Sequence, residues 1–456
     1  MKAAREPEAF AAELRAVLEA WASPALPPRV TVGFSGGLDS TVLLAALCRL
    51  DWPVRVRAAH VDHGLHPHSA DWRAHCAAAA ADLGAEFAAS RVAVDRTSKQ
   101  GLEAAAREAR YRALGELLAP GEWLLTAHHA DDQLETLLLR LLRGTGVRGL
   151  RGILPFAPFH SGWLGRPLLA FTREELRSQA EQSKLAWIED PSNLDERHDR
   201  NYLRARVLPA LRARWPTAAQ HGVRLAQQMT DAERLLESVA AEDAHALAAA
   251  WHLPRSALAP LEPARQRNLL RHLLRAVDLA PPSARTLDEL RTALLEARAE
   301  SRTHVRWPGG EGRVFGEALY LMAPLPPPSP PDYAAHIGVG STWLGPEGRL
   351  ALAPARDGAG LPQSWLDDGL TLRFRAGGER FKPLGREHHH SLKSLFQERG
   401  IVPWMRGRVP LLFHGAALAA IGDLWVSAHS GAAPAAEPRW RVEWTQHPPV
   451  QAPERR

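Results

Sequence analysis

The chain has 456 residues, of which 45% are hydrophobic and 23% charged, so it is long enough for about two to four globular domains. No apolar run reaches membrane-spanning length, and residues 1–8 lack the apolar core of a signal peptide. This predicts a cytoplasmic protein with no membrane partner. The two cysteines, Cys48 and Cys76, form no CxxC pair and no disulfide framework, so we expect buried thiols.

The positive charge is concentrated in one part of the chain. The formal net charge is +5, but residues 140–215 alone carry thirteen arginines and one lysine against eight acidic residues, a net charge of +6. Such a segment suits a polyanion, because each neutralised phosphate releases counterions. The alternative is that a GC-rich genome encodes arginine in place of lysine on ordinary solvent-exposed faces. Charge alone does not decide between this alternative and polyanion binding.

The first predicted strand is residues 29–34 and the first predicted helix residues 41–47. Between them lies the run Ser35, Gly36, Gly37, Leu38, Asp39 and Ser40. Two glycines allow a sharp turn at the helix N-terminus, where free N–H groups and the helix dipole favour a phosphate. No Gly-Lys-Ser/Thr follows, so the run is not a Walker loop. The alternative is a Gly-Gly turn capped by Asp or Ser.

The string SGGLDS after a strand resembles the PP-loop of ATP pyrophosphatases. That family cleaves ATP between its α- and β-phosphates and leaves AMP on an oxygen of the substrate. The resemblance implies that ATP binds at residues 35–40 and that the reaction is an adenylation. We assign the loop to pyrophosphate and its Mg²⁺, with the tentative metal ligand Asp39 also acting in catalysis.

The next elements alternate between strand and helix. Strands are predicted at 54–61, 87–94 and 122–127, and helices at 69–83, 102–118 and 131–143. A βαβ series builds a parallel sheet with helices on both faces and a ligand crevice at the carboxyl ends of its strands. Three segments leave those ends and should converge: 35–40, 60–66 and 128–132.

Residues 60–68 read HVDHGLHPH, which invites a metal site. Alternate side chains of a strand point to opposite faces and no second cluster follows, so we do not predict zinc. We expect Asp62 and His63 to border the nucleotide. The pattern HVDHGL followed by Arg is typical of tRNA(Ile)-lysidine synthetases, which are bacterial PP-loop enzymes. This chain resembles them except that His66 stands where Arg is usual, which leaves the role of His66 open.

Residues 101–111 resemble the helix NLEAxARxxRY of that family. Arg107 shares a face with Arg110 and Tyr111, and one arginine is expected to reach the active site, where Arg107 would bind substrate or tRNA. An exposed helix with its arginines paired to Glu103 and Glu108 is the equally weighted alternative.

The string from His128 to Thr136 reads HHADDQLET and again resembles the lysidine synthetases. Asp132 and Glu135 are three residues apart, so both carboxylates lie on one face in the first turn of a helix. We expect them to form an acidic pocket and to take part in catalysis. Asp131 is explained by the helix dipole alone.

Two further stretches extend the resemblance, Arg166-Pro167-Leu168-Leu169 and the run from Glu189 to Pro209. The second is similar to the family pattern EDPSNxD…RNxxRxxxLP. Its arginines are candidates for contacts with tRNA phosphates or for closing over the ATP phosphates, since arginine forks onto phosphate. These candidates are Arg200, Arg204 and Arg206.

The second half is predicted to be helical over 217–300, with a hairpin over 305–322 that turns at Gly309-Gly310. Residues 324–331 read PLPPPSPP, a stiff extended linker. Beyond it, a strand at 371–375 and a helix at 391–398 indicate a small α+β domain, with motifs that resemble the family's C-terminal domain. His388, His389 and His390 are expected in a solvated loop.

The expected architecture is therefore α/β, with three domains. We predict a parallel-sheet PP-loop domain of the adenine nucleotide α-hydrolase type at 1–216, a mainly helical substrate-binding domain at 217–323, a proline-rich linker and connecting segment at 324–370, and an α+β tRNA-binding domain at 371–445.

The resemblance covers residues 29–425. It implies that ATP and free L-lysine convert the wobble cytidine of a CAU-anticodon tRNA(Ile) to lysidine. Asp132 and Glu135 are assigned either to the lysine ammonium groups or to deprotonation of the attacking amine. A different PP-loop enzyme, such as a tRNA thiolase or an amidotransferase, is the first alternative, and a non-catalytic tRNA-binding protein is the second. The oligomeric state stays open, with a homodimer as one alternative.

Overall fold

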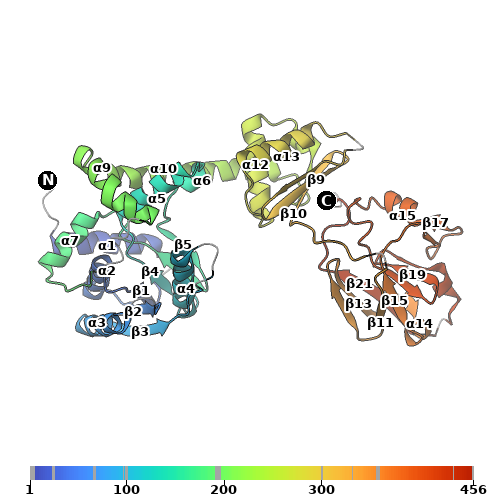
Figure 1. Cartoon of the computed structure of the whole chain (residues 1–456), viewed down its shortest axis with the longest axis horizontal. Coiled ribbons are helices and arrows are strands. Elements are labelled where there is room, and N and C mark those ends of the chain that lie inside the picture. The colour runs from blue at the N-terminus through green and yellow to red at the C-terminus, as the bar shows by residue number, and fades with distance from the viewer. Residues whose placement is uncertain are drawn as a thin grey trace. The chain divides into compact units, whose positions relative to one another are not determined.

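The fold was examined in a computed structural model of the chain, which forms two compact units, residues 1–235 and 236–456 (Figure 1). The structure describes residues 6–22, 26–64, 68–95, 97, 101–189, 197–298, 301–330, 332–355, 360–434 and 436–453. His66 and residues 190–195 of the EDPSNLD stretch lie outside the described residues.

The first unit is built on a six-stranded sheet of order β3-β2-β1-β4-β6-β5. Its strands are β1 (Arg29–Gly33), β2 (Arg55–Asp62), β3 (Glu86–Arg91), β4 (Trp123–Leu125), β5 (Phe156–Phe159) and β6 (Gly162–Gly165). β1 to β4 and β6 are parallel, which confirms the predicted parallel sheet, and β5 is antiparallel to β6. The β5–β6 hairpin was not predicted from the sequence.

Helices cover both faces of this sheet. They are α1 (Pro7–Trp21), α2 (Leu38–Arg49), α3 (Ser69–Asp82), α4 (Leu102–Glu116), α5 (Ala130–Leu142), α6 (Val147–Leu150), α7 (Arg173–Gln182), α8 (Asp199–Tyr202), a π-helix (Leu203–Val207), α9 (Leu208–Arg214) and the first part of α10 (Ala218–Ala244). Val32 and Leu125 pack with α1, α2 and α7, whereas Leu124 packs with Leu114 of α4 on the other face. No helix in the described part of the chain combines the length and apolar character needed to cross a bilayer.

The connections create a switch point between β1 and β4. The chain moves outward from β1 to β2 and β3, with α3 packed on the same face as α2, and then returns across the opposite face through α4 to place β4 beside β1. Ligands of open α/β sheets bind at such a switch point, which here is flanked by residues 35–40 and 128–132.

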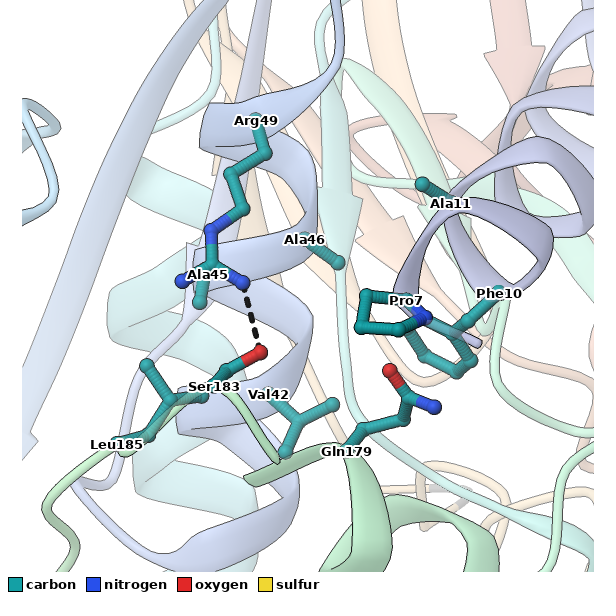
Figure 2. Close-up of a pocket in the computed structure, with 10 residues that line it drawn as sticks. All are labelled: Pro7, Phe10, Ala11, Val42, Ala45, Ala46, Arg49, Gln179, Ser183 and Leu185. Carbon is teal, nitrogen blue, oxygen red and sulfur yellow. Dashed lines mark hydrogen bonds between the residues drawn. The ribbon is translucent and has the colours of Figure 1, made fainter. Parts of the chain in front are cut away.

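Helix α7 and the residues after it support the loop that follows β1. It packs on α2 and α1 around a cavity of about 40 Å³, where Arg49 donates a hydrogen bond to Oγ of Ser183 at 2.7 Å (Figure 2). The chain that leaves α7 then reaches the loop, where the N–H of Ile188 donates to the carbonyl of Gly36 at 2.9 Å. Packing between α2 and α7 thus fixes one side of the glycine turn.

The middle part of the second unit combines helices with an antiparallel sheet. The last part of α10, α11 (Arg255–Leu258), α12 (Pro263–Ala276) and α13 (Ala284–Leu295) accompany β7 (His252–Pro254), β8 (His304–Trp307), β9 (Gly310–Phe315) and β10 (Ala318–Met322) in a sheet of order β7-β10-β9-β8. The predicted single hairpin is a three-stranded meander. Its first turn is at Pro308-Gly309, one residue earlier than predicted, because Gly309 supplies the positive φ of +87°.

The C-terminal part contains two larger antiparallel sheets, β11-β15-β18-β19-β20 and β12-β13-β21-β14. Their strands are β11 (Ala335–Ile337), β12 (Thr342–Gly345), β13 (Gly348–Pro354), β14 (Leu361–Pro362), β15 (Leu370–Arg373), β18 (Leu411–His414), β19 (Ala417–Ile421), β20 (Trp425–Val426) and β21 (Arg439–Thr445). The remaining elements are α14 (Gln363–Asp367), the pair β16 (Arg380–Phe381) and β17 (His390–Ser391), α15 (Leu392–Glu398) and a 3-10 helix (Ala428–Ala432). The expected connecting segment before residue 370 therefore belongs to this fold, because β11 to β14 pair with the later strands.

The proline-rich linker is attached to the C-terminal fold by two buried charged side chains. Glu347 accepts hydrogen bonds from the N–H and the hydroxyl of Ser329 at 2.6 and 3.0 Å, and Arg408 donates to the carbonyl of Pro326. Glu347 is fully buried and Arg408 is 6% exposed. The linker is extended, as predicted, but it does not act as a free spacer.

Strand β10 is buried on both of its faces. Leu319 and Leu321 pack against α12 and α13, while Tyr320 and Met322 join the core of the C-terminal fold. Trp404 completes this contact, with its ring 5.1 Å from that of Tyr320. The middle and C-terminal parts of the second unit therefore share a core.

We predict that Gly36→Ala destabilises the first unit by about 1–2 kcal/mol or more, because a residue with a Cβ is strained in the left-handed region. Gly36 has φ +78°, and an added Cβ would lie 2.8 Å from Sγ of Cys76 and 3.0 Å from Cδ1 of Ile188. Gly37→Ala is the matched control, since its φ is −77° and its nearest contact would be at 3.5 Å. Thermal unfolding measures the stability of both variants. Equal shifts of the two melting temperatures would contradict the assignment of backbone strain to position 36.

Candidate functional site

The loop of residues 35–40 forms a tight turn that exposes the N-terminus of α2. The hydroxyl of Ser40 donates to the carbonyl of Gly37 at 3.0 Å and lies 3.1 Å from that of Ser35. Thr41 donates to the same carbonyl at 3.0 Å. Gly37 is the N-cap and makes no side-chain cap, so the first N–H groups of the helix remain available to an anion.

Asp39 sits in the first turn of α2 and has an unsatisfied carboxylate oxygen. Its Oδ1 is buried and has no hydrogen-bond partner. Burial raises the pKa of Asp39 above its ordinary value, and His129 and Arg173 offset this only in part. A buried, unpaired oxygen beside an anion-binding loop is suited to a divalent cation. No group of three or more His, Cys, Asp or Glu side chains that could hold a metal ion occurs among the described residues.

His129 joins Asp39 to the first turn of α5. Its Nε2 lies 3.4 Å from Oδ2 of Asp132 and 3.7 Å from Oδ2 of Asp39, while its Nδ1 lies 3.5 Å from Oδ2 of Asp131. Burial lowers the pKa of His129, but the three carboxylates outweigh burial and raise it above the ordinary value. The ring is thus held between the loop after β1 and the turn after β4.

Asp132 and Glu135 share one face, as predicted, but that face is not an open acidic pocket. Arg204 donates to Oε1 of Glu135 at 2.6 Å and to Oδ1 of Asp132 at 2.7 Å. Arg200 donates to Oε2 of Glu135 at 2.8 Å and to the hydroxyl of Thr136 at 3.2 Å. Burial would raise the pKa of Asp132, but His129 and the guanidinium groups of Arg204 and Arg200 lower it to about 2. Asp132 is therefore ionised, and both carboxylates are paired with arginines.

A π-helix helps to hold these arginines in place. Arg200 lies on α8, Arg204 within the π-helix and Arg212 on α9. Arg212 donates to Oδ1 of Asp131 at 2.6 Å. A π-helix places an extra residue in its turn, so Arg212 stays on the side that faces α5. Three arginines from one continuous segment thus meet three carboxylates of one helical turn.

An arginine-lined cavity of about 580 Å³ lies on the other side of this turn. Its charged lining consists of Arg107, Arg140, Arg143, Arg166 and Arg200, and His128 and Thr136 contribute polar groups. Nη1 of Arg140 donates to the carbonyls of Gly149 and Gly152 at 2.6 and 2.9 Å, which shapes one wall. Nε of Arg166 is buried without a hydrogen-bond partner. The cavity is large enough for a nucleotide and offers mainly hydrogen-bond donors.

The other predicted site residues lie at the end of β2, in the cavity wall and on the π-helix. Asp62 and His63 lie at the carboxyl end of β2, where Oδ1 of Asp62 accepts from the N–H of Gly64 at 2.7 Å. Nδ1 of His63 is buried without a partner, and burial lowers the pKa of His63. Arg107 lines the cavity, with its guanidinium 5.0 Å from the ring of Tyr111, and Arg206 is exposed on the π-helix.

Sequence reasoning missed the roles of His128, His129 and Arg166, although all three stand in stretches that resemble the family. The signal was the adjacent histidine pair just before a helix at the carboxyl end of a strand. Adjacent side chains of an extended segment point in opposite directions, so one histidine faces the loop and its neighbour faces the cavity. What the pattern lacked was the sheet order that places a ligand region on each side.

The cysteines are buried thiols, as predicted. Burial raises the pKa of Cys76 to about 12 and that of Cys48 to about 11, so neither forms a thiolate near neutral pH. Sγ of Cys76 packs close to Gly36 and supports the loop from below.

We predict that Glu135→Gln and Arg204→Met each destabilise the first unit by about 1.5–3 kcal/mol, because each removes charge-assisted hydrogen bonds from a largely buried network in which other partners remain. The double variant should lose less than the sum of the two single losses. Asp199→Asn is the control, since its pair with Arg143 spans 3.5 Å and is largely exposed, and such pairs contribute about 0–1 kcal/mol. Urea denaturation checks the set, and a Glu135→Gln loss no larger than the Asp199→Asn loss would contradict it.

Three family models match the chain. The PP-loop domain matches residues 8–211, the TilS substrate binding domain residues 253–320 and the TilS substrate C-terminal domain residues 370–444. Among solved structures, a U34-tRNA thiolase from Methanococcus maripaludis has 16% identity and a TM-score of 0.42, covering 49% of this chain and 80% of its own. An NMN synthetase from Francisella tularensis has 12% identity and a TM-score of 0.29, covering 48% and 96%.

Curated relatives match almost the whole chain. The tRNA(Ile)-lysidine synthase of Alkalilimnicola ehrlichii is 42% identical over 92% of this chain and 94% of its own length. Those of Methylococcus capsulatus and Coxiella burnetii are 40% and 37% identical, over 88% and 86% of this chain and 93% and 87% of their own. With its PP-loop, its paired carboxylates and both TilS domains, the chain belongs to the tRNA(Ile)-lysidine synthase family.

Proposed function

We propose that this protein uses ATP to join L-lysine to the wobble cytidine of a CAU-anticodon tRNA(Ile), in the cytoplasm. One observation carries the proposal. The phosphate-binding loop and the arginine-lined cavity flank the same turn of α5, the loop through His129 and the cavity through His128. A nucleotide base in the cavity and ATP at the loop would meet across that turn.

On the loop side, residues 35–40 would hold the pyrophosphate part of ATP. The N–H groups at the start of α2 suit phosphate oxygens, and Asp39 would hold Mg²⁺ through its unpartnered oxygen. When bound, Mg²⁺ would neutralise the charge that develops on the leaving pyrophosphate. Asp62 and His63, at the end of the neighbouring strand, would border the nucleotide.

On the cavity side, the cytosine would present its carbonyl oxygen toward the turn of α5. That oxygen attacks the α-phosphorus of ATP, a P–O bond forms, and the bond to pyrophosphate breaks. AMP is then attached to the base. The lysine ε-amine then attacks the ring carbon that carries this oxygen. A C–N bond forms, the C–O bond breaks to release AMP, and the amine proton passes to a base. Arg107 and Arg166 would hold the nucleotide in the cavity, and Arg206 is a candidate for tRNA phosphate on the exposed surface.

Asp132 and Glu135 would receive the positively charged lysine. In the structure their charges are taken by Arg200 and Arg204, whose side chains are 25% and 31% exposed. Both arginines suit phosphate as well as carboxylate. We infer that arrival of ATP and tRNA draws them toward phosphate and frees the carboxylates for an ammonium group.

The buried thiols disfavour the thiolase alternative. Thiol chemistry needs a thiolate or a cluster ligand, whereas Cys76 is fully buried and has a pKa of about 12. Cys48 lies within α2 and has a pKa of about 11. A sulfur-transfer reaction therefore lacks a reactive group among the described residues.

Incubation with ATP, labelled lysine and tRNA transcripts tests the function. We expect label in tRNA(Ile) with a CAU anticodon, and none with Asp39→Ala, which should keep its fold and tRNA binding because Asp39 serves phosphate and metal.

Asp132→Asn should release pyrophosphate without lysine but incorporate lysine poorly. Equal losses of pyrophosphate release with and without lysine would assign Asp132 to the metal instead of lysine. Wild-type adenylation by Asp39→Ala would overturn the loop assignment.

The C-terminal fold is proposed to place the tRNA. It carries basic side chains and none of the catalytic motifs, and exposed examples are Arg380, Lys393 and Arg399. Removal of the chain after residue 323 is not a clean test, because Tyr320 and Met322 would lose the core that covers them. Charge reversal on the surface avoids this difficulty.

We predict that the triple change Arg380→Glu, Lys393→Glu and Arg399→Glu weakens tRNA binding and leaves ATP binding unchanged. The slope of log K against log salt should become shallower by about one for each lost phosphate contact. Arg285→Glu, at an exposed site of α13, serves as the control. Unchanged affinity and slope in the triple variant would assign the tRNA surface to the arginines of residues 140–215.

A further inference from the structure

The arginine-lined cavity contains two polar side chains that are not arginines, Thr136 and His128. Arginine has only donors, so Arg107, Arg140, Arg143, Arg166 and Arg200 cannot accept a hydrogen bond. The hydroxyl of Thr136 already accepts from Arg200 at 3.2 Å. His128 is the remaining group in the described lining whose side chain can provide a nitrogen lone pair.

The orientation of the His128 ring follows from its partner. Nδ1 lies 2.9 Å from the hydroxyl of Thr126, a buried residue that is not part of the cavity wall. The edge with Nδ1 therefore faces the protein, and the opposite edge with Nε2 faces the cavity. Because guanidinium groups surround the cavity, the electrostatically favoured tautomer turns its lone pair toward them, and the proton on Nδ1 is donated to Thr126.

The ring stays neutral at physiological pH. Burial lowers the pKa of His128 to about 3. The carboxylate of Asp132 opposes this shift, while Arg166, Arg107 and Arg200 act in the same direction as burial. A neutral ring with its proton on Nδ1 keeps Nε2 as an acceptor, whereas a charged ring would offer only donors.

We propose that Nε2 of His128 accepts a hydrogen bond from the exocyclic amino group of the cytosine and thereby makes the cavity select cytosine over uracil. The inference rests on the function proposed above. Cytosine presents an amino donor beside two acceptors on its pairing edge, which matches one acceptor among arginine donors. Uracil presents a carbonyl in place of the amino group, and that oxygen would face the lone pair of Nε2.

The test compares tRNA(Ile) transcripts that carry cytidine or 2-pyrimidinone riboside at the wobble position. The second base lacks only the amino group. The readout is kcat/KM for pyrophosphate release from the full-length protein with ATP and without lysine. We expect the wild type to prefer cytidine by about 10- to 100-fold, as for one hydrogen bond in a buried site. His128→Phe should remove most of this preference, and His128→Gln, which can still accept, should retain part of it.

Two further variants separate this role from a structural one. His221→Phe, at an exposed site on α10, should keep the wild-type preference. Thr126→Val removes the partner of Nδ1 without removing the ring and should reduce the preference even if His128→Phe fails to fold. The difference in intrinsic reactivity of the two bases cancels, because only the change in their ratio between proteins is used.

A preference that persists in both His128→Phe and Thr126→Val would overturn the inference, as would a wild type that treats both bases alike. In either case activity on cytidine tRNA would leave the proposed function standing. A wild type that releases no pyrophosphate with cytidine tRNA would instead reject the proposed function, and the inference with it.

Discussion

The charge balance at the first turn of α5 is the constraint on which the site depends. Asp131, Asp132 and Glu135 lie within five residues, and two of their side chains are almost fully buried. Such a cluster is stable only if cations neutralise it, and three arginines and His129 do so. The turn therefore ties together the loop after β1, the segment after β4 and the helices after residue 198.

The same charge balance explains how one turn can serve two ligands. His129 directs its charge toward Asp39 and the phosphate-binding loop, while His128 belongs to the cavity wall. Burial lowers the pKa of both histidines, but three carboxylates raise the pKa of His129 above its ordinary value, whereas at His128 the carboxylate of Asp132 is opposed by three guanidinium groups. The pKa values of two adjacent rings are thus shifted in opposite directions.

The second unit shows how a short strand can couple two folds. β10 has only five residues, yet its alternating side chains enter two cores, one with α12 and α13 and one with the C-terminal sheets. Glu347 and Arg408 then fasten the proline-rich linker beside this contact. The C-terminal fold is consequently held against the middle part rather than suspended from it.

The sequence by itself determined the strands β1 to β4, the helices α2 to α5, the loop of residues 35–40 and the shared face of Asp132 and Glu135, because periodicity and glycine placement act over a few residues. It did not reveal the β5–β6 hairpin or the strands β11 to β14, which are stabilised by partners distant in the chain. Only the tertiary structure decided that Arg200 and Arg204 meet the two carboxylates and that His128 lines the cavity while His129 lies beside Asp39. Those outcomes depend on sheet order and on a π-helix, and ion pairs between residues some 65 positions apart leave no local pattern to read.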